Sequence, residues 1–576
     1  MREMTRNGKS RCARRPAGAR PCRRKETAVR KLRVFALGAL GAALASLAYY
    51  HAAGLPRTDQ PQAPMPSAPH PNTPAPQSPC LLPNGQLDIA CTLPGGAHPD
   101  PDVVRVNKEI DDTFQKSLAE MNSNAPGDEY GRIVLLGRLE LYDKNLSVNR
   151  NIACVTCHMP ETGFTSAVSL WNQTIVSNPG SVPITNATGL MPNYRIEFRK
   201  PYPYCYSTFS PILHYNRAQE NLFGGNFWDM RATGIPATNP AASQAQDPPV
   251  DPQEQAFPDP ACVIYRISRG PYAGYFRAIW GAQSFNVNWP PDTERVCATP
   301  NSSNAPHPRA LNLAAVDRGT VMASYDHFAM AIAVNESSPE VSPFTSKFDM
   351  WLAGQAQLTP DEQRGFDLFN GRARCNQCHL SGTGNAQLRT TRNGAGGTVA
   401  MTSDAPLFTD FQAHNIGVPR NLGRPAYYFD RPDQYGYVGN PQGPAYIDKG
   451  VGQFLRGPHN PSSAWAKLAD QFDGKFLTPT LRNVDKRPYP GFVKAYFHNG
   501  YAKSLKTVVH FYNTSQALPR CPQGSPGEAV TCWPEPAVPA NVDTRFVGNL
   551  GLSGVEEDQI VAFLRTLTDA YYYSPK

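Results

Sequence analysis

The chain has 576 residues, of which 18% are charged and 40% hydrophobic, and it contains 57 proline, 45 glycine and 13 cysteine residues. This length and apolar content suffice for two or three folded domains, whereas a mean hydropathy of −0.44 excludes a protein that crosses a membrane many times. The formal net charge is +8, but residues 1–33 hold 13 basic and 2 acidic residues, and the 42 basic and 45 acidic residues that remain predict no nucleic-acid-binding surface.

The N-terminus is typical of a targeting segment. The basic residues 1–33 precede 17 uncharged residues, VFALGALGAALASLAYY, within a predicted apolar helix over residues 34–54. A basic stretch before an apolar one marks export, with the positive side kept in the cytoplasm. The long run and the lack of a clear A-x-A site favour a single anchor in the inner membrane over a cleaved signal peptide. Either alternative places the rest of the chain in the periplasm.

Residues 55–100 contain 12 prolines and are predicted to form an extended linker. An oxidising compartment favours disulfides between cysteines that are neighbours in sequence, and three such pairs are predicted. These pairs are Cys80–Cys91, Cys262–Cys297 and Cys521–Cys532, which leaves Cys205 without a partner.

Two C-x-x-C-H motifs carry the chemistry of the sequence. They are Cys154-Val-Thr-Cys157-His158 and Cys375-Asn-Gln-Cys378-His379. Two thiols at this spacing can add to the two vinyl groups of one haem, and the adjoining histidine can then bind the iron. A zinc site and a dithiol redox site are the alternatives. The zinc alternative is disfavoured because the two pairs are far apart in the sequence, and covalent attachment of two c-type haems is the preferred interpretation.

The motifs reveal a weak internal repeat. The segments 137–142 and 365–371 each fit the end of an amphipathic helix that leads into a haem loop. Helical periodicity is also clear over residues 103–121, 316–334 and 555–567, and strand alternation is scarce. The sequence therefore predicts a mainly α fold with long Pro/Gly-rich loops, made of two cytochrome c-like haem domains over residues 101–350 and 351–576, preceded by the N-terminal apolar helix.

From about residue 130 onward, the chain resembles the bacterial dihaem cytochrome c peroxidases and their MauG-like relatives. The resemblance is carried by the segments CVTCHMPETGF, NFWDMRATG, SPFTSKFDMWLAG, CNQCH, FLTPTLRNVDKRPYPGFVKAYFHNG and SLKTVVHFYN. It departs from the family in long insertions after the first motif and in WDMR, where WDGR is usual. The resemblance implies an oxidoreductase that binds peroxide at the N-terminal haem, whose iron ligand would be His158.

The resemblance also implies roles around the first haem. Splitting peroxide requires a proton to move between its two oxygens, and a carboxyl group can perform this transfer. The family alignment nominates Glu254 as that acid and base and Gln244 as its polar neighbour, although by residue type alone Glu254 reads as a solvated loop charge. Trp228 is the aromatic expected between the haems, and Arg231 is a candidate partner for a haem propionate. No histidine lies between His158 and His214, which favours an open iron and leaves His214 as the alternative cap.

The second haem would use His379 and a further axial ligand. No methionine follows position 401, and the resemblance places Tyr512 where peroxidases have methionine. An ordinary core tyrosine and ligation by Met401 are the alternatives. The resemblance places His498 and Arg482 between the haems, whereas structural roles are expected for His327 and His510.

The sequence is therefore identified as that of an exported dihaem c-type peroxidase. It is expected to reduce hydrogen peroxide with electrons from a small donor protein, either a cytochrome c or a blue copper protein. MauG-like oxidation of a partner protein is the first alternative, although Ala373 stands where MauG-type chemistry uses a tryptophan relay. A dihaem electron carrier is the second. The family often binds calcium, for which Asn216 is one candidate ligand.

Overall fold

The computed structural model describes residues 78–82, 86–185, 193–235, 237–382, 391–392, 398–399 and 406–570. The predicted basic segment 1–33, the predicted apolar helix over 34–54 and the first part of the predicted linker lie outside these residues. Within the part of the chain that is described, no helix is both long and apolar enough to cross a membrane.

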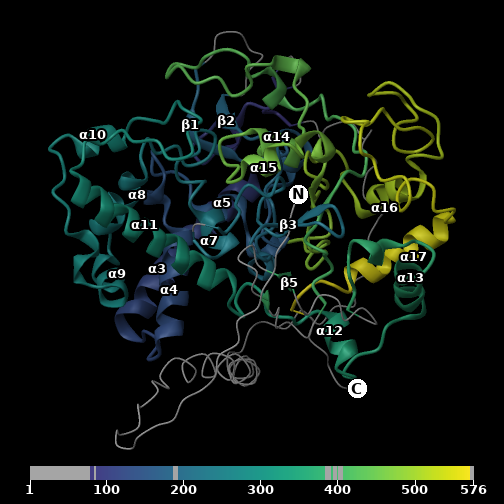
Figure 1. Cartoon of the computed structure of the whole chain (residues 1–576), viewed down its shortest axis with the longest axis horizontal. Coiled ribbons are helices and arrows are strands. Elements are labelled where there is room, and N and C mark those ends of the chain that lie inside the picture. The colour runs from purple at the N-terminus through teal and green to yellow at the C-terminus, as the bar shows by residue number, and fades with distance from the viewer. Residues whose placement is uncertain are drawn as a thin grey trace, which may run out of the picture. The chain divides into compact units, whose positions relative to one another are not determined.

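The described chain is mainly helical with little sheet, as predicted (Figure 1). The helices of the first 352 residues are α2 (Ile89–Thr92), α3 (Pro101–Ser123), α4 (Glu129–Tyr142), α5 (Cys154–Cys157), α6 (Ser169–Gln173), α7 (Pro240–Ala245), α8 (Pro260–Ser268), α9 (Ala273–Trp280), α10 (Thr293–Cys297), α11 (Ala315–Glu336) and α12 (Lys347–Leu352). Those that follow are α13 (Pro360–Asn370), α14 (Val451–Arg456), α15 (Ser463–Ala466), α16 (Leu505–Thr514) and α17 (Gly554–Arg565).

The described strands are short and form four antiparallel pairs. They are β1 (Pro179–Pro183) with β2 (Tyr194–Ile196), β3 (His214–Asn216) with β4 (Asn221–Phe223), β5 (Thr391–Arg392) with β6 (Thr398–Val399), and β7 (Ala413–His414) with β8 (Phe476–Leu477). Most of the remaining chain is loop, so tertiary contacts rather than a sheet position the functional residues.

The helices predicted from periodicity are confirmed as α3, α11 and α17, and their ends have physical causes. Asp100 accepts a hydrogen bond from the backbone at the start of α3, where Pro101 occupies the first turn. Ser553 and Glu556 form a capping box at the start of α17, and Thr359 and Glu362 form another at the start of α13. Side-chain caps therefore begin these helices at defined residues.

The predicted repeat before the two haem motifs is visible in the packing. Helix α4 crosses α11 at Gly137, and α13 crosses α17 at Gly365, where the two helices lie side by side (Figure 1). A β-carbon on Gly137 would lie 2.1 Å from the carbonyl oxygen of Ala331, and one on Gly365 would lie 1.9 Å from that of Gln559. Each helix that leads into a haem loop therefore requires a glycine to approach a later helix closely.

We expect Gly365→Ala to destabilise the protein by about 1–3 kcal/mol, because the added methyl group would displace α17 from α13. The measurement is denaturant unfolding of the purified holoprotein. Gly319→Ala is the control, since Gly319 lies within α11 with nothing within 4 Å of the added β-carbon. It should leave stability unchanged or raise it by up to about 1 kcal/mol, reflecting helix propensity. Equal stability of Gly365→Ala and the wild type would contradict the close crossing.

The long loops are joined by buried polar contacts. The guanidinium of Arg195, on β2, is fully buried and forms an ion pair of 2.8 Å with Asp433. The same side chain donates hydrogen bonds to the carbonyl oxygens of Pro252 at 3.1 Å and Asn301 at 2.6 Å. Because a buried charge is stable only when it is paired and hydrogen-bonded, Arg195 holds three distant loops in one arrangement.

The three predicted disulfides, Cys80–Cys91, Cys262–Cys297 and Cys521–Cys532, are all confirmed. Cys205 is buried and free, as expected. Residues 86–100, at the end of the predicted linker, are folded rather than extended. They contain α2, and the side chain of Ile89 is completely buried in an apolar cluster near the first disulfide. Apolar residues follow the proline-rich stretch, and their packing folds this segment although the proline content of residues 55–100 predicts an extended chain.

Candidate functional site

The first C-x-x-C-H motif opens onto a cavity of about 540 Å³, called cavity 1 below. Helix α5 is a single turn that carries Cys154 and Cys157, and both thiols are free. His158 follows directly, and its Nδ1 lies 3.1 Å from the carbonyl oxygen of Phe164. Burial lowers the pKa of His158 to about 4, so the imidazole is neutral. The backbone contact leaves Nε2 as the nitrogen that can bind a metal.

The second motif repeats this arrangement around a cavity of about 210 Å³, called cavity 2. Cys375 and Cys378 are also free, and Nδ1 of His379 lies 2.9 Å from the carbonyl oxygen of Phe408. Burial lowers the pKa of His379 as well. Phe164 and Phe408 both have left-handed backbone conformations, with φ of 61° and 53°. The two histidines are therefore oriented by the same backbone device.

The donor sets fit two covalently attached haems. In each cavity one motif contributes two free thiols followed by a neutral histidine, in the order that thioether attachment requires. In the part of the chain that the structure describes, six of the seven cysteines outside the motifs form disulfides, whereas the four within the motifs are free. The two pairs line different cavities, which does not match a zinc site that needs both pairs around one ion.

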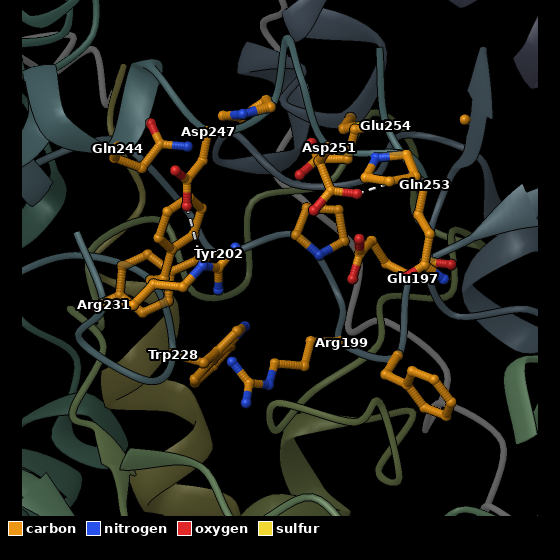
Figure 2. A pocket seen from close by; sticks show the side chains of 18 of the residues that line it. Glu197, Arg199, Tyr202, Trp228, Arg231, Gln244, Asp247, Asp251, Gln253 and Glu254 are labelled. Atoms are coloured by element: carbon orange, nitrogen blue, oxygen red, sulfur yellow. Dashed lines mark hydrogen bonds and ion pairs between the residues drawn. The ribbon is translucent and has the colours of Figure 1, made fainter. Parts of the chain in front are cut away.

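Three carboxyl groups meet in cavity 1. Oxygens of Glu197, Asp251 and Glu254 lie within 4.8 Å of one another, and Figure 2 shows these side chains facing one another. Burial, followed by repulsion from Asp251 and Glu197, raises the pKa of Glu254 well above its usual value. Burial and the charge of Asp251 raise the pKa of Glu197 to about 8. The cluster therefore retains at least one shared proton at neutral pH.

The loop that carries Glu254 is fixed by its backbone. The carbonyl oxygen of Glu254 accepts a hydrogen bond of 2.7 Å from the amide of Ser181, which lies in β1. The amide of Glu254 donates to the carbonyl oxygen of Asp251 at 3.1 Å. Gln244, at the end of α7, lines the same cavity and lies on the side of Asp247 and Arg231 in Figure 2. The structure thus brings Gln244 and Glu254 into one cavity with the first haem motif.

Two arginines in cavity 1 are already paired with carboxylates. Arg231 lies 3.2 Å from Asp229 and 3.1 Å from Asp247, and Arg199 lies 2.7 Å from Asp229 and 2.8 Å from Asp448. These ion pairs hold the pKa of Asp229 well below its usual range, despite burial. Arg231, the candidate partner for a haem propionate, therefore already contacts two protein carboxylates in this cavity.

Trp228 lines both cavities. Its side chain is 7% exposed, and its indole Nε1 donates a hydrogen bond of 2.9 Å to the carbonyl oxygen of Lys200. The ring meets His498 edge-on, with centroids 6.4 Å apart. Trp228 thus occupies the wall between the cavities, where the sequence placed it.

Tyr512 lies in cavity 2 together with the second haem motif. It is a half-buried residue of α16, and burial raises the pKa of its hydroxyl group. His498 and Arg482 line the same cavity, and Arg482 forms a two-point ion pair with Asp349 at 2.9 and 2.8 Å. Met401, the alternative ligand, lies outside the described residues.

Other candidates take structural roles. His214, the alternative cap for the first iron, is not among the residues that line cavity 1. Its Nδ1 lies 2.9 Å from the carbonyl oxygen of Ile212, and its ring stacks on Phe223, because the hairpin β3–β4 turns it away. The side-chain oxygen of Asn216 accepts hydrogen bonds from the following backbone within this hairpin, so nothing supports calcium there.

The two helical histidines behave as expected. The ring of His327 stacks on Trp280 with centroids 4.5 Å apart, and Nδ1 of His510 lies 2.9 Å from a carboxylate oxygen of Glu557. Both contacts are within ordinary packing, away from the residues that line either cavity.

Sequence reasoning missed four residues that line cavity 1, namely Glu197, Asp251, Arg199 and His459. All four come from loops without a periodic pattern. His459 follows α14. Among the described residues, the histidines that line this cavity are His158 and His459. The sequences around these residues, such as Asp-Pro and Glu-Phe-Arg, contain no motif that predicts that the side chains meet in one cavity.

Comparisons with known proteins define the class of the site. Residues 132–357 match the family model of the di-haem cytochrome c peroxidases. The chain is 26% identical over 458 residues to the methylamine utilization protein MauG of Paracoccus denitrificans (strain Pd 1222), an alignment that covers 78% of this chain and 90% of MauG. It is 23% identical over 441 residues to the cytochrome-c peroxidase IdrP1 of Denitromonas iodatirespirans, with coverage of 76% and 81%.

The fold agrees with this class. The crystal structure of the diheme peroxidase BthA from Burkholderia thailandensis E264 matches with a TM-score of 0.51 at 24% identity, covering 76% of this chain and 86% of that one. Over residues 132–357 the chain is thus similar to the di-haem cytochrome c peroxidases, and over most of its length it is similar to MauG, and these relatives are oxidoreductases that use peroxide. The two C-x-x-C-H motifs are the candidate attachment sites for two c-type haems.

Proposed function

We propose that this protein reduces hydrogen peroxide in cavity 1, using electrons that enter at cavity 2. The observation that carries the proposal is the position of Glu254, whose carboxyl group shares cavity 1 with Cys154, Cys157 and His158 and is kept protonated by its surroundings. A haem bound to these three residues would supply the redox centre for peroxide.

The protein's own groups move the protons. Reduction of one hydrogen peroxide consumes two electrons and two protons and yields two water molecules. Glu254 donates its proton to the oxygen that leaves as water. The carboxylate of Asp251 accepts the proton from the other peroxide oxygen, because it lies within the same cluster as Glu254. The cluster thus holds an acid and a base side by side, and Gln244 supplies a polar neighbour.

Electrons would come from a small donor protein, a cytochrome c or a blue copper protein, and pass the wall at Trp228. Tyr512 would complete the ligands of the second iron opposite His379, and its anionic oxygen would lower the reduction potential. The three disulfides favour an oxidising compartment, which supports a periplasmic location. The N-terminal segment would then be an inner-membrane anchor or a cleaved signal peptide.

Two alternatives rest on particular observations. The likeness to MauG favours peroxide-driven oxidation of a partner protein, but Ala373, where that chemistry uses a tryptophan relay, is 2% exposed and offers only a methyl group. The second alternative, an electron carrier without peroxide turnover, rests on His459, which lines cavity 1. If His459 bound the first iron as a second histidine ligand, no position would remain for peroxide.

Spectroscopy followed by turnover tests the proposal. We expect electron paramagnetic resonance of the ferric holoprotein to show one high-spin and one low-spin haem, and peroxide to oxidise two equivalents of reduced donor protein. Two low-spin haems without turnover, converted by His459→Ala to one high-spin haem, would establish the carrier instead. Peroxide consumption that requires a protein substrate and leaves its side chains oxidised would establish the MauG-like alternative.

A further inference from the structure

One cation on the wall between the cavities differs from the others. Among the described residues, only Trp228 and Lys200 line both cavities. Arg199 and Arg231 in cavity 1 and Arg482 in cavity 2 each pair with at least one carboxylate. No carboxylate in the described part of the chain forms an ion pair with Lys200. The wall therefore carries an ammonium group with no anionic partner from the protein.

The backbone fixes the position of Lys200. Its amide donates a hydrogen bond of 2.9 Å to the carbonyl oxygen of His498, and its carbonyl oxygen accepts the 2.9 Å bond from the indole of Trp228. The residue is 8% exposed, and Nζ lies 5.8 Å from the centroid of the Trp228 ring. The backbone of Lys200 is thus held within the inter-cavity wall, and little of the residue is exposed to solvent.

The ammonium group has little to compensate its burial. Its hydrogen bond is a long one of 3.4 Å, to the carbonyl oxygen of Pro201. By contrast, Nζ of Lys494 is buried against three carbonyl oxygens, at 2.7, 3.0 and 3.4 Å. Burial lowers the pKa of Lys200 to about 8. A buried charge with so few partners is costly unless an anion joins it.

The ligands that these cavities are built to hold bring such an anion, because every haem carries two propionate carboxylates. We propose that Lys200 binds a haem propionate at the wall beside Trp228 and thereby stabilises the reduced state of that haem. A charge-assisted contact between ammonium and carboxylate would satisfy the cation that the protein leaves unpaired. This inference rests on the attachment of two haems and not on the peroxide reaction, so each can fail without the other.

The test is a potentiometric titration of both haems, monitored by their optical spectra, in holoprotein carrying Lys200→Met, Lys200→Gln or Lys200→Arg. Removing a nearby positive charge favours ferric over ferrous haem. We expect Lys200→Met and Lys200→Gln to shift the equilibrium of at least one haem tenfold or more toward the ferric state, which is about 59 mV for a one-electron couple. Lys200→Arg should keep the wild-type potential, because the guanidinium preserves the charge.

Lys503→Met is the matched control. Lys503 is also withdrawn from solvent, with Nζ 2.6 Å from the carbonyl oxygen of Asn172, and burial lowers its pKa to about 7, but it lines neither cavity. Its removal should leave both potentials unchanged. Unchanged potentials in Lys200→Met and Lys200→Gln would overturn the proposal, as would an equal shift in Lys200→Arg. If Lys200→Met fails to retain haem, the potentials of Lys200→Gln, which keeps a polar side chain without the charge, decide whether the proposal holds.

Discussion

Replacing Glu254 with glutamine should slow the reaction of the ferric holoprotein with peroxide by about 10²–10⁴-fold, the range typical for loss of a general acid. An amide has nearly the same shape as a protonated carboxyl group, but it cannot release a proton. Both haems should remain attached, and the ferric optical spectrum should stay close to that of the wild type. Stopped-flow mixing with hydrogen peroxide measures the rate constant directly.

Glu140→Gln is the matched control for Glu254→Gln. Glu140 is a completely buried residue of α4, and burial and the charge of Asp143 raise its pKa well above the usual value. Neither of its carboxyl oxygens has a hydrogen-bond partner, and it lines neither cavity. The same chemical change there should leave the peroxide reaction unaltered. A wild-type rate in Glu254→Gln would remove Glu254 from the reaction.

The pH profile separates proton donation from a structural role. A carboxyl group whose pKa is raised is protonated below that pKa and loses its proton as the pH rises through it. Because burial and the charges of Asp251 and Glu197 raise the pKa of Glu254 well above its usual value, the wild-type rate should hold through the mildly acidic range, where an ordinary glutamic acid loses its proton, and fall at higher pH. The residual rate of Glu254→Gln should not show this decline. A decline of the same size in the variant would place the proton donor elsewhere.

Tyr512→Phe should abolish the low-spin signal of one haem and leave the other haem unchanged. No hydrogen bond occupies the Tyr512 hydroxyl among the residues that the structure describes, and burial raises its pKa, so the phenolate forms only if a ferric ion binds it. Loss of an anionic ligand should also raise the reduction potential of that haem. Electron paramagnetic resonance and a redox titration measure the two effects.

Tyr496→Phe controls for the loss of a hydroxyl group in the same cavity. Tyr496 also lines cavity 2, but its hydroxyl group donates to Asp485 at 3.2 Å and lies 3.4 Å from Arg487. That substitution should leave both haem signals in place. An unchanged spectrum in Tyr512→Phe would exclude tyrosine ligation and direct attention to Met401.

The sequence was informative wherever chemistry or periodicity is local. The haem motifs place two thiols and a histidine within five residues, and α3, α11 and α17 repeat apolar residues at helical spacing. The disulfides join cysteines that are neighbours in the sequence. Such features depend on short separations along the chain, so a single sequence suffices to predict them.

The distal parts of the site could not be predicted, because loops from distant segments build them. Arg195, on the strand before Glu197, binds the carbonyl oxygen of Pro252 and thereby helps to bring Glu197 and Glu254 together. The alternative cap His214 lies elsewhere because the hairpin β3–β4, and not its place in the sequence, decides where its ring lies. The resemblance to the family, rather than residue pattern, singled out Glu254 and Tyr512.

The twin backbone device around His158 and His379 bears on how the chain evolved. Each imidazole is held by a phenylalanine carbonyl in a left-handed turn, and each motif follows a helix that crosses a later helix at a glycine. Such paired features are what duplication of one small haem-binding unit would leave. The two sites differ elsewhere, since cavity 1 is lined by the carboxyl groups of Glu197, Asp251 and Glu254 and cavity 2 by the phenol of Tyr512.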